Sequence, residues 1–125
     1  MLKIALDAMG GDHAPEAIID GALTAAKEFN VHIILVGNKT LIQSLLPNGT
    51  SNISIQHAPE AIAMDESPLT AYKKKKESSI HIGLNLVKEG KADAFVSAGN
   101  TGAVMSCSLF ILGRIPGVDR PALAS

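Results

Sequence analysis

The segment with the clearest chemical potential is a loop of small and polar residues at positions 99–102. It follows a short apolar run at 94–96 and precedes a longer one at 103–112, the pattern of strand, tight loop and helix. Unhindered backbone N–H groups at a helix N-terminus attract anions, phosphate above all. Two of these residues are also good helix N-caps, and spacing alone leaves the two interpretations about equal. The candidate phosphate ligands are Gly99, Asn100, Thr101 and Gly102.

A second loop of this kind follows the N-terminal apolar run. Gly10 and Gly11 would let the backbone approach a ligand, and Asp12 and His13 add titratable groups. His13 is the first candidate for a general acid or base because the unperturbed pKa of histidine lies near neutrality; Asp12 is the second. For this loop alone, a turn with an aspartate cap and a surface histidine is the stronger alternative. Two such loops in so short a chain nevertheless predict one site built from both.

Basic residues form a further set of candidates. A run of four lysines could contact an acidic partner or a phosphorylated ligand, although such runs are more often a solvated face. Arg114 and Arg120 flank a loop that contains proline, and either could clamp an oxyanion. For Arg120 the alternative is pairing with Asp119 or a place on the open surface. The lysine run consists of Lys73, Lys74, Lys75 and Lys76.

The remaining reactive side chains favour no site. Cys107 lies in an apolar helical stretch without a partner nearby in sequence, which favours a buried structural cysteine over a nucleophile. His32, His57 and His81 lack the spacing of metal ligands. We therefore expect no metal and no cofactor.

The elements that position these residues follow from composition and pattern. At 125 residues, 46% hydrophobic and 18% charged, the chain can bury one core, and with 3% aromatic residues that core must be aliphatic. The formal net charge of −1 argues against a general nucleic-acid surface. The single cysteine excludes an internal disulfide and fits a cytoplasmic protein. The pattern shows neither a signal peptide nor a run long enough to span a bilayer.

Hydrophobic periodicity predicts alternating strands and helices. Strands are expected at 3–6, 31–36, 53–55 and 94–96, with the start of another at 122–124. Helices are expected from 15 to about 29, at 39–46 and at 103–112, and residues 78–89 favour a helix over a strand. On the first helix, Ile18, Ala22, Ala25 and Phe29 should share a face toward the sheet. Residues 57–76 should form a long functional loop with one helical turn.

Such alternation predicts an α/β fold with a mostly parallel sheet and helices on both faces. Ligands bind such sheets outside the carboxyl ends of the strands, where both glycine loops are expected. Residues 1–125 would form one domain or part of one.

Three segments taken together are far more specific than any one: residues 7–15, 97–103 and 113–124. Their order and spacing resemble the bacterial phosphate acyltransferase family, the acyl-carrier-protein:phosphate transacylases. That family is usually more than twice as long, so residues 1–125 resemble the N-terminal part of a single catalytic domain whose remainder is absent. The resemblance implies a three-layer α/β/α sandwich, related to phosphotransacetylases and here truncated at its C-terminus.

The resemblance also implies an activity and partners. The family moves a long-chain acyl group from acyl-carrier protein to inorganic phosphate, and the acyl phosphate feeds glycerol-3-phosphate acylation in phospholipid synthesis. It implies a soluble homodimer in the cytoplasm. This homodimer would work close to the membrane surface or close to a glycerol-3-phosphate acyltransferase as its neighbour. The lysine run would then steer the acidic carrier protein. A short-chain phosphotransacetylase-like enzyme using coenzyme A and a non-enzymatic phosphate-binding domain remain alternatives.

Overall fold

The computed structural model describes residues 1–122, so Leu123 and Ala124 of the last expected strand lie outside the described residues. Strands and helices alternate for most of the chain. The elements are β1 (Leu2–Asp7), α1 (Glu16–Glu28), β2 (Val31–Gly37), α2 (Lys39–Leu45), β3 (Ile53–His57), α3 (Pro68–Lys74), α4 (Ser79–Lys88), β4 (Ala94–Val96) and α5 (Thr101–Ile111).

The strands form a four-stranded sheet in the order β3-β2-β1-β4, and every pair is parallel. Leu6 of β1 is in register with Leu35 of β2 on one side and Val96 of β4 on the other. The order reverses between β1 and β4, since β2 and β3 extend the sheet to one side of β1 and β4 to the other. A ligand crevice is expected at such a reversal, outside the carboxyl ends of the strands.

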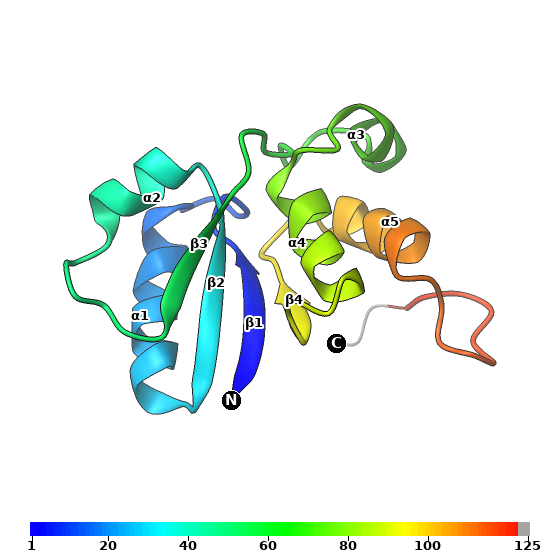
Figure 1. The fold of residues 1–125 in the computed structure, drawn as a ribbon. Coiled ribbons are helices and arrows are strands. Elements are labelled where there is room, and N and C mark those ends of the chain that lie inside the picture. The colour runs from blue at the N-terminus through cyan, green and yellow to red at the C-terminus, as the bar shows by residue number, and fades with distance from the viewer. Residues whose placement is uncertain (123–125) are drawn as a thin grey trace.

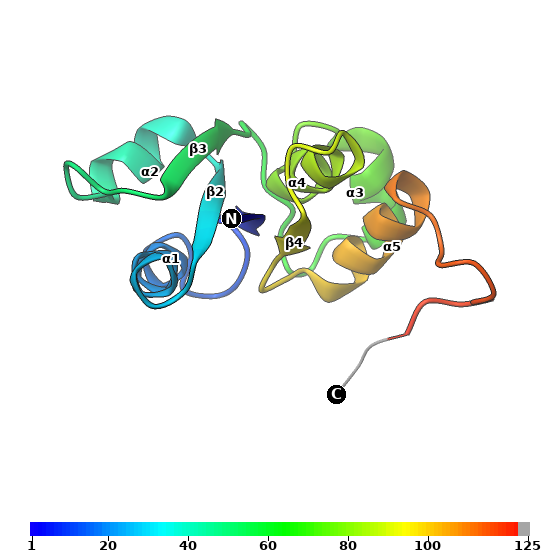
Figure 2. The same ribbon diagram turned by 60° about the horizontal axis from the view of Figure 1, so that its bottom comes forward.

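Helices cover both faces of the sheet, which confirms the predicted α/β layering (Figure 1). Alternate strand residues point to opposite faces, so Ile33 and Leu35 pack beneath α1 and α2 while Ala5 and Val36 pack beneath α4. A third apolar cluster joins α3, α4 and α5 through residues that include Cys107. Figure 2 shows these three helices together on the side of β1 away from α1 and α2.

Several local expectations are confirmed and two need correction. Residues 78–89 are helical: the Ser78 hydroxyl accepts the N–H of His81 at 3.1 Å and begins α4. The stretch 57–76 contains more helix than expected, because α3 extends over seven residues. The expected sheet-facing side of α1 is only partly buried: Ala22 is 1% exposed and Phe29 is 62% exposed.

Candidate active site

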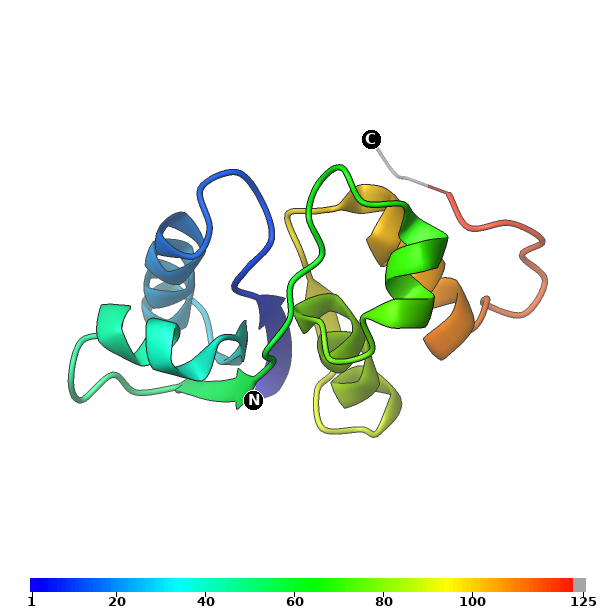
Figure 3. The same ribbon diagram turned by 90° about the horizontal axis from the view of Figure 1, so that it is seen from above.

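The two glycine loops lie side by side at the carboxyl edge of the sheet, as the sequence predicts. Because β1 and β4 are parallel neighbours, the residues after each strand leave the sheet at the same edge. There the Ser97 hydroxyl donates a hydrogen bond of 2.8 Å to Oδ2 of Asp7. Figure 3, which views the molecule from above, shows the loop after β1 beside the segment that leads into α5.

Glycine is required where the loops touch. A Cβ added to Gly10 would lie 2.5 Å from the carbonyl oxygen of Gly99 and 2.6 Å from Oδ2 of Asp7. Gly11 has a φ of +96°, and its added Cβ would lie 3.0 Å from Cβ of Ala98. Positive φ and close backbone approach are the two conditions that select glycine over other residues. The absence of a Cβ at Gly10 and Gly11 therefore allows the two loops to pack closely against each other.

Asp7 lies at the centre of this junction and is 1% exposed. Its Oδ1 accepts the N–H of Met9 at 3.0 Å. Burial raises the pKa of Asp7, and hydrogen bonds from the Ser79 and Ser97 hydroxyls and from the Met9 and Gly10 N–H groups oppose that shift. Within residues 1–122, no cation lies within 4.0 Å of this carboxylate. Hydrogen bonds from neighbouring N–H and hydroxyl groups therefore stabilise the charged form of Asp7 in place of a cation.

Asn100 is 7% exposed, and its side chain is fully occupied inside the protein. Its Oδ1 accepts the N–H of Ala103 at 3.3 Å, which caps α5. Its Nδ2 donates to the carbonyl oxygens of Ala63, at 3.2 Å, and Glu66, at 3.0 Å. This side chain thus joins the start of α5 to the loop before α3. The geometry assigns Asn100 a positioning role, with no side-chain donor left for phosphate.

The first turn of α5 retains unused backbone donors. The first N–H groups of any α-helix lack intrahelical partners. The N–H of Ala103 donates to the side chain of the N-cap residue Asn100. No hydrogen bond within residues 1–122 uses the N–H group of Thr101 or that of Gly102. Thr101 is exposed, while an added Cβ on Gly102 would lie 2.7 Å from Cγ of Pro68. An anion at this N-terminus would meet backbone donors and the positive end of the helix dipole.

Comparisons with known proteins show the family of this chain. The family model described as "Fatty acid synthesis protein" matches residues 2–125. The chain belongs to this family. It is 61% identical to the phosphate acyltransferase of Desulforamulus reducens, 55% to that of Heliobacterium modesticaldum and 51% to that of Bacillus subtilis. These matches cover 98–100% of this chain and 37–38% of the relatives' length, in their N-terminal part.

In this member of the fatty acid synthesis protein family, Asp12 and His13 are exposed beyond the buried part of the loop. Their side chains form no hydrogen bond or ion pair with residues 1–122; the backbone carbonyl of His13 accepts the N–H of Ala17 at 3.1 Å. The structure thus places both on the same loop as Gly10 and Gly11. It leaves their side chains open to solvent.

The lysine run divides into two kinds of residue. Lys75 turns inward: its ammonium group binds the Glu66 carboxylate and donates to the carbonyl oxygen of Ala61 at 2.8 Å. A backbone hydrogen bond from Ala63, and secondarily the hydrogen bond from Lys75, lower the pKa of Glu66. The outward-facing residues of the run are Lys73, Lys74 and Lys76.

Arg120 lies on the segment after α5, which returns along that helix, since Val104 and Pro121 line the same shallow pocket. The Arg120 side chain is exposed and forms no hydrogen bond or ion pair within residues 1–122. Arg114 is engaged, since its Nη1 donates to the carbonyl oxygen of Asp119 at 2.6 Å. Of the two arginines, Arg120 is the one whose guanidinium has no partner in the described part of the chain.

Three side chains central to this site were missed by sequence reasoning: Asp7, Ser97 and Pro68. The sequence carried a positional signal for the first two. Asp7 is the last residue of β1 and Ser97 is the first residue after β4, and both strands lead into glycine loops. Cys107 is buried, as predicted, and burial raises its pKa to about 11. The described residues hold no cluster of three metal-binding side chains. None of the helices described in residues 1–122 is long and apolar enough to cross a membrane.

Proposed function

We propose that the full-length protein transfers a long-chain acyl group from acyl-carrier protein to inorganic phosphate and releases acyl phosphate. The observation that carries the proposal is the convergence of both glycine loops on one sheet edge, beside the free N–H groups of α5, in a chain so similar to named phosphate acyltransferases. Because the chain spans 38% of the first of these relatives, the activity is proposed for the longer protein.

The reaction needs few groups. A phosphate oxygen attacks the thioester carbonyl carbon, the C–O bond forms, and the carbonyl oxygen carries the negative charge of a tetrahedral intermediate. When the C–S bond breaks, the carrier-protein thiolate leaves and takes up a proton, while phosphate gives up its own. Phosphate itself is the nucleophile, so no covalent acyl-enzyme is required. Holding phosphate in line with the carbonyl supplies much of the rate.

Each role falls to a specific part of the two loops. Backbone N–H groups of Thr101 and Gly102 hold phosphate at the α5 N-terminus. The backbone N–H groups of Gly10 and Gly11 donate to the oxyanion. His13 moves the proton, with Asp12 as the second candidate. Their exposure leaves both accessible to a bound substrate.

Two exposed groups add to the binding of substrate and partner. The free guanidinium of Arg120 supplies a further anion contact for phosphate. The outward face of the lysine run, Lys73, Lys74 and Lys76, steers an acidic carrier protein. The protein acts as a cytoplasmic homodimer. It works close to the membrane surface or close to a separate enzyme, a glycerol-3-phosphate acyltransferase.

Supplying the full-length protein with long-chain acyl-carrier protein and inorganic phosphate tests this proposal. Acyl phosphate formation supports it. Turnover of acetyl-coenzyme A alone would favour a short-chain phosphotransacetylase, and no turnover of either thioester would favour a phosphate-binding domain without catalysis.

A pair of variants tests the helix N-terminus directly. Thr101→Pro removes the first N–H of α5 at the one helical position that tolerates proline, as Pro68 shows at the start of α3. Thr101→Ala removes the hydroxyl and keeps the N–H. A hydrogen bond to a charged group contributes about 1.5–3 kcal/mol, so proline should raise the KM for phosphate by roughly tenfold to a hundredfold. An equal KM in both variants would remove this N–H from the phosphate site.

A further inference from the structure

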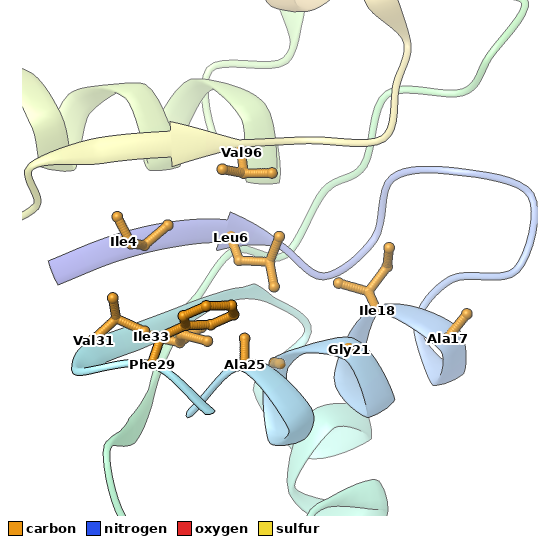
Figure 4. Close-up of a pocket in the computed structure, with 11 residues that line it drawn as sticks. Ile4, Leu6, Ala17, Ile18, Gly21, Ala25, Phe29, Val31, Ile33 and Val96 are labelled. Atoms are coloured by element: carbon orange, nitrogen blue, oxygen red, sulfur yellow. The ribbon is translucent and has the colours of Figure 1, made fainter. Parts of the chain in front are cut away.

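One face of the sheet is bare over β1 and β4. On the side that carries α1, an open groove of about 420 Å³ lies between this helix and the strands (Figure 4). Strands β1, β2 and β4 and helix α1 all contribute to it. The lining residues are Ile4, Leu6, Ala17, Ile18, Gly21, Ala22, Ala25, Phe29, Val31, Ile33 and Val96.

The lining of this groove has the chemistry of a protein core. Its side chains are all aliphatic or aromatic, and it contains no charged or hydroxyl-bearing residue. Two of its larger members face water, Phe29 at 62% exposure and Val96 at 51%. A continuous apolar surface of this kind marks a place where another apolar surface packs.

Sheet geometry explains where the cover is missing. Parallel sheets are buried on both faces in folded proteins. On the opposite face, α4 covers Ala5 of β1, and Phe95 of β4 packs into the same cluster. On the groove face α1 packs over Ile33 and Leu35 of β2, Leu6 of β1 is only partly buried against that cluster, and Val96 of β4 remains exposed. The outer layer is therefore incomplete at β1 and β4.

We propose that an apolar segment of the full-length protein, from the region following residue 125, packs into this groove and completes the outer layer of the sheet. The length of the relatives supports this occupant: this chain matches 37–38% of them, in their N-terminal part, which leaves more than half of each relative to supply a cover. A segment tethered in the same chain also binds at a high effective concentration, in the millimolar range for short flexible linkers.

Two other occupants fit less well. A second copy of the chain would have to bury roughly 800 Å² on each partner for a stable interface, so it would need contacts outside the one helix and three strands that line this groove. A substrate acyl chain would leave the sheet bare between turnovers. A permanent intramolecular cover meets the requirement of the sheet at all times.

Thiol accessibility in the full-length protein tests the proposal. Ala25→Cys places a thiol in the groove, and Asp20→Cys places one on the exposed side of the same helix as a matched control. Alkylation at each site is followed by peptide mass spectrometry, and the native Cys107 reacts slowly because it is buried. We expect the thiol at 25 to react at least tenfold more slowly than that at 20 in the native protein, and equally fast in denaturant. Equal native rates would overturn the proposal.

A photo-cross-linking amino acid in place of Ala25 identifies the occupant. A cross-link within one chain to a peptide beyond residue 125 supports the proposal. An adduct of twice the chain mass, or protection of the Ala25→Cys thiol that falls on dilution, would overturn it in favour of a second copy. Protection that appears only after a long-chain acyl thioester is added would overturn it in favour of substrate.

Discussion

Replacing Asn100 by alanine should cost far more stability than replacing Asn38, although both residues cap helices in the same way. Asn38 has an extended backbone, and its Oδ1 accepts the N–H of Leu41 at 3.1 Å at the start of α2. Asn100 does the same for Ala103 at the start of α5. The two sites differ in burial, since Asn38 is exposed and Asn100 is 7% exposed. They also differ in that only Asn100 donates from Nδ2 to other carbonyl oxygens.

The structure sets the size of the difference. Loss of an asparagine N-cap costs about 1 kcal/mol, which is the whole effect expected for Asn38→Ala. Asn100→Ala also loses the hydrogen bonds to Ala63 and Glu66, each contributing about 1 kcal/mol. The expected total for Asn100→Ala is roughly 3 kcal/mol of unfolding free energy, about 2 kcal/mol more than for the control.

Urea unfolding of the full-length protein measures both variants against the wild type. The loop before α3 should also become more mobile in the Asn100 variant, with faster amide hydrogen exchange at residues 63–66 and no such change in the Asn38 variant. Equal losses of stability in the two variants would refute the role assigned to the Nδ2 hydrogen bonds. Activity measured in the same variants separates positioning from binding, because Asn38 lies at the start of α2, outside the proposed site.

Three further predictions concern the same molecule. Gly10→Ala should cost about 1–3 kcal/mol of unfolding free energy in urea, because its Cβ would lie 2.5 Å from the Gly99 carbonyl oxygen; a change within about 0.5 kcal/mol would contradict the loop contact. Burial raises the pKa of Asp7, so the native state binds the carboxyl proton of Asp7 more tightly than the unfolded chain does. Protonated Asp7 therefore contributes stability below pH 3.8, and this contribution is lost as the pH rises through the raised pKa. The urea midpoint of Asp7→Asn should not fall as the pH rises through this range. Parallel plots of urea midpoint against pH for the variant and the wild type would contradict this prediction. Burial, and secondarily the charge of Lys76, lowers the pKa of His81. The Nδ1 atom of His81 is buried without a hydrogen-bond partner within residues 1–122, and its ring stacks on Tyr72. Stability should therefore fall as pH drops below 6.5 and should do so less in His81→Phe, as thermal unfolding across that window will show.

Much of the fold could be predicted because its signals are local. The apolar run at 31–36 became β2, and the Ser78 cap with its helical spacing became α4. Strand and helix alternation then implied a parallel sheet, and parallel neighbours implied that both glycine loops meet at one edge. The second turn of α3 was missed because Pro68 reads as a loop residue, although proline also fits the first position of a helix.

The candidate site was harder to predict, since partners distant in sequence decide each role. Asn100 has the residue type and position of a phosphate ligand, yet its amide is held by carbonyl oxygens more than thirty residues earlier. Lys75 is chemically identical to its neighbours in the run, but Glu66 turns it inward. Nothing at positions 74–76 alone distinguishes these lysines.

The sequence by itself determined the order of the elements, the aliphatic core and the place of two glycine loops after two strands, because hydrophobic period and turn chemistry act within a few residues. Only the tertiary structure decided which donors remain free. Packing brought the buried Asp7 carboxylate against Ser97 and Gly10, and it left the N–H groups of Thr101 and Gly102 without partners in the described residues. It also left the sheet bare at Val96. Hydrogen bonds and burial depend on distances between segments far apart in the chain, and those distances exist only once the chain is folded.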